Sequence, residues 1–222
     1  MSGYMTFWSK EYVKELNKAG DTGIFKVVYG SHHTRMPSIS SLRKGDVIYP
    51  VAILQNTLCI MSRLPIEKIE PAFDYLMRET GQPHAALIPE GILLKMQGLY
   101  GEFVTFSGGS GYVDKVTIPE NITQVIEEDQ LTPIPHSFHQ EPITCCAELA
   151  ASGSHGAEIY PRPIPIETVH QLLFGKTKSS QKPLRFDKKG CPNSISLSGF
   201  VRKMSDETFG IFEGFFADET KE

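Results

Sequence analysis

The feature that most constrains the fold is a pair of apolar segments separated by two polar residues. Residues 47–54 (VIYPVAIL) and 57–63 (TLCIMSR) are rich in the β-branched, aromatic and aliphatic residues that favour strands. Gln55-Asn56 joins them as a tight polar turn, and Lys44-Gly45-Asp46 forms a turn before the first. Because apolar and polar residues hardly alternate, we expect a β-hairpin that is buried on much of both faces.

Helices with recognisable ends surround this hairpin. Ser9 is a suitable N-cap for a helix over residues 10–19, and Gly20 is a suitable end for it. The spacing of apolar residues predicts three further helices, over residues 71–80, 165–174 and 206–216.

Residues 101–106 and 112–118 predict a second hairpin around the glycine-rich stretch 107–111. Glycine-rich loops can cradle phosphate, but this one lacks the Lys-Ser or Lys-Thr of a P-loop and no helix follows it. We interpret it as a hairpin turn. The predicted fold class is therefore α+β, with a mixed or antiparallel sheet or a small barrel and flanking helices.

Composition divides the 222 residues into three regions. Residues 1–118 form a regular α+β region. Residues 119–163 are rich in Pro, Glu, Ser and Gly with little periodicity, which is typical of an irregular linker or excursion. Residues 164–222 form a helix–strand–helix region, either packed on the first or separate from it. The length allows one large domain or two small ones.

The formal net charge of −4 conceals blocks of opposite charge. Residues 116–175 carry eight acids and the single base Arg162, whereas residues 176–203 carry eight bases and the single acid Asp187. Such blocks create local fields that attract charged partners. The basic block is either a phosphate-binding face or a solvated loop, and the acidic block could face a basic protein. The residues concerned are Lys182, Arg185, Lys188 and Lys189 in the first, and Glu127, Glu128 and Asp129 in the second.

The cysteines and histidines do not predict a metal site. Cys59 lies in an apolar segment and fits a buried core position. His136, His139, Cys145 and Cys146 are zinc-ligand types, but the two cysteines are adjacent and no Cys-x-x-Cys occurs. With no signal peptide and no long apolar segment, we expect a cytoplasmic protein without a membrane span.

No catalytic motif is present. The sequence lacks Gly-x-Ser-x-Gly, His-Glu-x-x-His, a Gly-x-Gly-x-x-Gly that opens a helix, and the deaminase pattern of His-x-Glu with Pro-Cys-x-x-Cys. These absences favour a non-catalytic binding role, with no catalytic residue and no cofactor predicted.

A resemblance appears at the first hairpin. Residues 42–51 (LRKGDVIYPV), followed by 58–63 (LCIMSR), look like the passage of PUA-like barrels in which a basic residue and Gly-Asp precede an apolar strand and its return strand. These barrels include the EVE and ASCH domains, and the resemblance covers about the first half of the chain. The second half resembles uncharacterised bacterial proteins at residues 144–148, 163–165 and 199–205.

The PUA-like resemblance implies binding of RNA or of modified bases, with aromatic side chains around the base and basic residues on the phosphates. The leading hypothesis is therefore a nucleic-acid-binding protein. The alternative is a protein-binding inhibitor, or an immunity protein, for a basic toxin. In the first half of the chain, the stacking candidates are Trp8, Phe7 and Tyr49, and the phosphate candidates are Arg35, Arg43 and Lys44.

Overall fold

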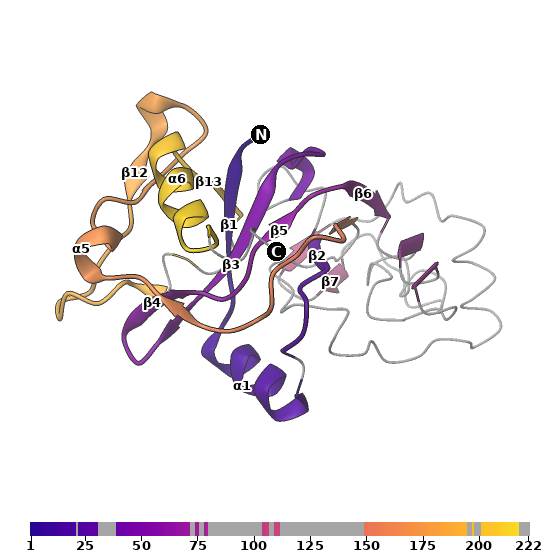
Figure 1. Cartoon of the computed structure of the whole chain (residues 1–222), viewed down its shortest axis with the longest axis horizontal. Coiled ribbons are helices and arrows are strands. Elements are labelled where there is room, and N and C mark those ends of the chain that lie inside the picture. Colours follow the sequence, from indigo (N-terminus) through magenta and orange to yellow (C-terminus); the bar gives the residue numbers. More distant parts are fainter. Residues whose placement is uncertain are drawn as a thin grey trace. The chain divides into compact units, whose positions relative to one another are not determined.

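The computed structural model describes residues 1–20, 22–30, 39–71, 74–75, 78–79, 104–106, 109–111, 149–194, 197 and 201–217, whose helices and strands are drawn in Figure 1. The chain forms two compact units. The first contains Met1–Val27, Leu42–Lys68 and Ser152–Glu222, and the second contains Val28–Ser41 and Ile69–Ala151.

The first unit is built on a mixed β-sheet. Strands β3 (Val47–Leu54) and β4 (Thr57–Ile60) form the predicted hairpin, and β1 (Gly3–Phe7) lies parallel to β3. The sheet is completed by antiparallel strands, with the order β10-β4-β3-β1-β13 and with β5 also paired to β3. These added strands are β5 (Leu64–Pro65), β10 (Arg162–Pro163) and β13 (Arg202–Lys203). The predicted α+β class with a mixed sheet is confirmed, and no pairing among the described strands closes the sheet into a barrel.

Strand β3 is buried on both faces, as its sequence predicts. Its residues Val47, Tyr49 and Val51 belong to one apolar cluster, and the alternate residues Ile48 and Ala52 are equally inaccessible. Cys59, on β4 opposite Ala52, is also a buried core residue, as expected.

Two predicted helices form with the predicted caps. In α1 (Lys10–Ala19), the hydroxyl of Ser9 accepts a hydrogen bond from the N–H of Tyr12, and Gly20 ends the helix at φ 68°. In α6 (Asp206–Gly214), Ser205 accepts from the N–H of Thr208 in the same way. Helix α6 packs on β1 and β11, and its Phe212 contributes a fully buried ring to the cluster of β3.

The predicted helix over residues 165–174 is wrong in its second half. Only α5 (Ile166–Val169) is helical, and Leu173–Phe174 is strand β11, paired with β12 (Lys182–Pro183) after the short 3-10 helix η4 (Lys178–Ser180). Tertiary hydrogen bonds outweigh local helix propensity here. The N–H of Leu173 donates to the hydroxyl of Thr208, and its carbonyl accepts from the N–H of Ser205.

Residues 153–160 belong to the segment expected to be an irregular linker, and their backbone is bonded on both sides. On one side Gly153 donates to Lys26, and on the other Ala157 donates to Arg63. The approach is closest at Gly156, where a Cβ atom would collide with the carbonyl oxygen of Phe25. A side chain is therefore excluded at this position.

The second unit contains most of a three-stranded sheet in the order β2 (Val27–Gly30), β9 (Leu149–Ser152) and β6 (Lys68–Pro71). Because Pro71 ends β6, the predicted helix does not begin there, although residues 74–75 and 78–79 are helical. Strands β7 (Val104–Phe106) and β8 (Gly109–Gly111) pair, so residues 109–111 are strand and not turn. The predicted strand 112–118 lies outside the described residues. The remaining element is the 3-10 helix η1 (Ile39–Ser41).

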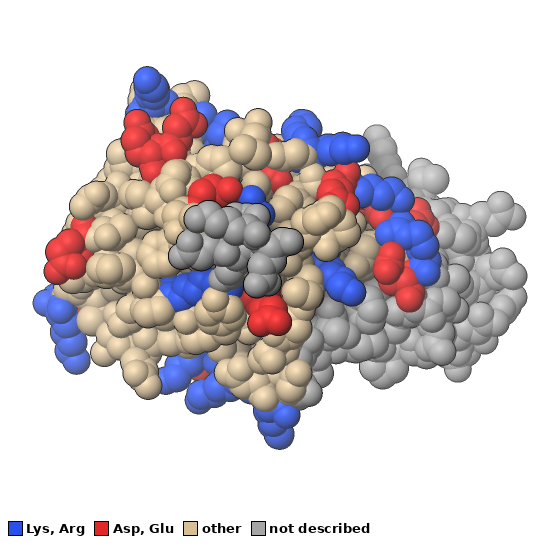
Figure 2. Space-filling view, viewed as in Figure 1, with Lys and Arg blue, Asp and Glu red and all other residues tan. Residues whose placement is uncertain are grey.

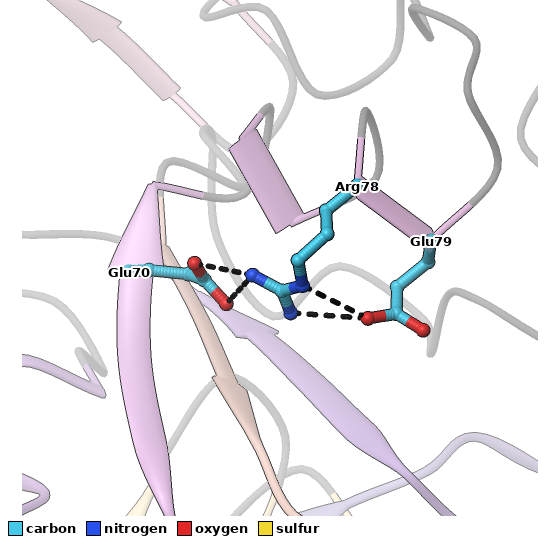
Figure 3. A network of polar contacts seen from close by, with 3 residues as sticks. All are labelled: Glu70, Arg78 and Glu79. Atoms are coloured by element: carbon cyan, nitrogen blue, oxygen red, sulfur yellow. Dashed lines mark hydrogen bonds and ion pairs between the residues drawn. The ribbon is translucent and has the colours of Figure 1, made fainter.

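An arginine organises the polar contacts of this second unit. Arg78 lies between two carboxylates, as Figure 3 shows, with its Nη1 2.7 Å from both oxygens of Glu70 and its Nε 3.1 Å from Glu79. The same guanidinium lies 5.2 Å from the ring centre of Tyr75, which makes an edge contact with Tyr29. The network is internally neutralised and offers no open charge.

Candidate nucleic-acid interface

The aromatic side chains expected to stack on a base are interior residues. Trp8 follows β1 and is 1% exposed, and its ring meets Tyr12 and Phe25 edge to face at centroid distances of 5.3 and 5.5 Å. Tyr49 lies at the centre of β3 and is fully buried, while Phe7 is partly buried against the same cluster. Trp8 and Tyr49 therefore present no ring face to solvent in this structure.

The polar end of Tyr49 is committed to an internal network. Its hydroxyl donates to the carboxylate of Glu213 on α6, which also accepts two hydrogen bonds from Arg63. Burial raises the pKa of Tyr49, and the hydrogen bond to Glu213 raises it further, so the phenol stays protonated. This network connects β3, α6 and the segment after β4, which is a structural role.

The basic residues of the first turn are at the surface. Arg43 and Lys44 are exposed before β3, where the carboxylate of Asp46 accepts hydrogen bonds from the N–H of Arg43 at 3.0 Å and of Ser2 at 2.8 Å. The turn is thereby fixed while its two cations face water. Arg35, Glu127, Glu128 and Asp129 lie outside the described residues.

The basic segment, residues 176–203, contains a well-defined loop at residues 185–193. The N–H of Asn193 donates to the carbonyl of Arg185 at 2.8 Å, and the N–H of Asp187 donates to the carbonyl of Cys191 at 2.9 Å. At the tip, the carboxylate of Asp187 accepts from the N–H groups of Cys191 and Lys189, which lowers the pKa of that carboxyl. The single acid of the segment is therefore used to shape the loop.

Four cations predicted to bind phosphate are displayed by this segment. Lys182, Arg185, Lys188 and Lys189 are all exposed, with the two lysines at the tip of the loop. Burial lowers the pKa of the Arg202 guanidinium, and the nearby positive charge of Arg185 lowers it further. Two like charges at short range create a local positive potential, which an anion would relieve.

Acidic side chains do not neutralise the segment within the described part of the chain. The ion pairs there join Arg63, Arg78 and His155 to glutamates of other segments. In the face shown in Figure 2, blue and red side chains alternate in several places, so the positive charge does not form one continuous field there. The cationic character therefore belongs to the segment itself.

A stacked pair of rings lies within the same region. The ring of His170, which follows α5, stacks on Phe186 with a centroid distance of 4.3 Å and an interplanar angle of 27°. Phe186 is partly buried against the core cluster, whereas His170 is exposed. The inner ring is therefore anchored while the outer ring can be reached from solvent, next to Arg185 and the loop tip.

Sequence reasoning did not find this pair. No motif or periodicity relates His170 to Phe186, because their contact depends on the β11–β12 pairing that brings the end of α5 beside the loop. The signal that was available is compositional: an aromatic residue, Phe186, lies inside the block of basic residues.

Metal binding receives no support from the described residues, among which no group of three or more His, Cys, Asp and Glu side chains could hold an ion. The weighed set of His136, His139, Cys145 and Cys146 lies outside them. Within the same residues, none of the helices is both long enough and apolar enough to cross a bilayer.

Comparison of the chain with protein-family models, with curated proteins and with solved structures finds no match in any of the three.

Proposed function

We propose that this protein binds single-stranded nucleic acid through its basic segment, residues 176–203, with His170 as the stacking surface. The observation that carries the proposal is the exposed ring of His170, stacked on the anchored ring of Phe186 within a segment rich in exposed Lys and Arg. Aromatic stacking together with flanking cations is the usual chemistry of single-strand recognition.

Each part of the site has a separate physical task. Lysine and arginine side chains on phosphates release condensed counterions, which makes the affinity depend on salt. A ring that continues an existing stack accepts the flat face of a base, which is accessible in an unpaired strand and covered in a duplex. Stacking therefore supplies a preference for single strands that the cations alone do not supply.

This proposal keeps the predicted partner and moves the site. Trp8 and Tyr49 have no part in it because they are buried, and the PUA-like resemblance is not needed for it. Lys182, Arg185, Lys188 and Lys189 remain phosphate ligands, with Arg35, Arg43 and Lys44 as predicted further contacts. A cytoplasmic location, which the free thiols of Cys59 and Cys191 support, is part of the proposal.

The test measures binding of a fluorescent single-stranded oligonucleotide by anisotropy at several salt concentrations. We expect an affinity that falls steeply with salt, and at least about tenfold weaker binding by Lys188→Glu/Lys189→Glu. The matched control, Lys18→Glu/Lys26→Glu, changes the net charge equally at two exposed residues elsewhere. Equal losses in both variants would reduce the effect to net charge and contradict the assigned site.

A second comparison isolates the stacking. His170→Ala should weaken single-strand binding about five- to tenfold, whereas His170→Tyr, which keeps a ring, should not. His155→Ala serves as the control because His155 is another exposed histidine. Binding that is equal for single strand and duplex, or unaffected by His170→Ala, overturns the stacking role. Absence of oligonucleotide binding at low salt overturns the function and favours the protein-binding alternative.

A further inference from the structure

A groove lies on the first unit, between helix α1 and the β3–β4 hairpin. Its volume is about 550 Å³, and α1 forms one side while the ends of β3 and β4 form the other. Pro161 and Pro163, at strand β10, complete the lining. A volume of this order is typical of sites for small molecules.

The helix side of the groove is cationic. Lys10 and Lys14 are both exposed, and because they are four residues apart they lie on the same face of α1. Among the described residues, neither lysine is in an ion pair and no acidic side chain lines this groove. Two adjacent ammonium groups on one rim favour an anion between them.

The rest of the groove is largely apolar. Val13 on α1, Leu54 at the end of β3 and the two prolines supply aliphatic surface, and Cys59 lies among them. Burial raises the pKa of the Cys59 thiol, so this part of the lining carries no charge. An apolar lining with cations on one rim suits a molecule that is apolar at one end and anionic at the other.

The hairpin turn at the end of the groove is held in an unfavourable conformation. Gln55 and Asn56 have φ angles of 49° and 66°, in the left-handed region that residues with a side chain seldom adopt. Gln55 lines the groove and also a second, adjoining hollow of about 420 Å³. Strained backbone is often retained where it positions a group for binding, and here it directs an amide side chain to the junction of the two spaces.

We propose that this groove binds a small organic anion, with its charged group between Lys10 and Lys14 and its apolar part against Val13, Leu54 and Pro163. The amide of Gln55 can donate a hydrogen bond to the same anionic group. This inference does not rest on nucleic-acid binding, because it uses different residues on a different part of the first unit.

Anilinonaphthalene sulfonate, an aromatic sulfonate that fluoresces in apolar sites, is the probe. We expect saturable fluorescence enhancement with the full chain, and displacement by octanoate but not by octylammonium at the same concentration. Lys10→Glu/Lys14→Glu should weaken the binding at least about tenfold. The control is again Lys18→Glu/Lys26→Glu, in which Lys18 lies on the same helix and does not line the groove.

An uncharged variant guards against loss of folding and against non-specific dye binding. Asn17→Phe places a ring in the groove from an exposed helix position and should block the probe without changing the charge. Cooperative urea unfolding of each variant shows that the dye is not reporting a partly unfolded state. Unchanged affinity in either groove variant, or displacement by octylammonium equal to that by octanoate, overturns the proposal.

Discussion

The guanidinium of Arg63 grips the carboxylate of Glu213 at two points, with Nε donating to Oε1 at 2.6 Å and Nη2 donating to Oε2 at 2.9 Å. The hydroxyl of Tyr49 donates to the same carboxylate. The two charged side chains are only 16% and 34% exposed, so water replaces either partner poorly. A single acid of α6 therefore joins the centre of the sheet to the segment after β4.

Removing the arginine should destabilise the fold. Arg63→Met leaves the carboxylate of Glu213 partly desolvated with only the phenol as a partner, and we expect the free energy of unfolding to fall by about 1–2 kcal/mol. Urea unfolding followed by Trp8 fluorescence measures the loss. Arg43→Met, at an exposed arginine of the same unit, is the control and should change stability by less than about 0.5 kcal/mol. Equal losses in the two variants would show that the pair contributes nothing.

The same pair gives a defined pH dependence. Burial acts to raise the pKa of Glu213, but the hydrogen bonds from Arg63 and Tyr49 outweigh it and lower the pKa below the ordinary 4.5. Because the folded pKa is the lower one, this stabilisation is present above pH 4.5 and is lost as pH falls through the folded pKa. Wild type should therefore exceed Glu213→Gln in stability at neutral pH, and the difference should shrink below about pH 4.5. A difference that stays constant from neutral pH to about pH 3 contradicts this assignment.

The single tryptophan reports whether the interior position of Trp8 is correct. Its 1% exposure predicts emission shifted to the blue of free tryptophan and weak quenching by iodide. Saturation with an oligonucleotide should leave this emission unchanged, because the proposed stacking surface is His170. Strong quenching on binding would instead return Trp8 to the role that the sequence suggested for it.

Two glycines should respond to alanine in opposite directions. Gly156→Ala brings a Cβ into the carbonyl oxygen of Phe25, so we expect a loss of about 3 kcal/mol or more, or failure to fold. Gly210→Ala, within α6, meets nothing within 4 Å and should stabilise the protein by up to about 1 kcal/mol, because alanine favours the helix. Chemical unfolding of both variants is the measurement. A mild effect of Gly156→Ala would show that the segment can move away from Phe25.

Local rules were sufficient where short-range interactions decide the structure. The strands of the hairpin, its two-residue turn, and the caps Ser9, Gly20 and Ser205 follow from strand propensity and from groups that bond neighbours in sequence. They failed for residues 170–174, where bonds to Thr208 and Ser205 replace the helix. The energies of such distant bonds are comparable to helix propensity, so a sequence window cannot include them.

The sequence by itself determined the α+β class, the doubly buried hairpin and the concentration of positive charge in residues 176–203. Only the tertiary structure decided which side chains face solvent. An aromatic residue serves equally as a core anchor or as a stacking surface, and the choice depends on what packs over its face. For Trp8 and Tyr49 that surface is occupied by neighbouring rings, and for His170 it is open to solvent. The same reason places the organic-anion groove beyond sequence analysis, since it exists only where α1 and the hairpin meet.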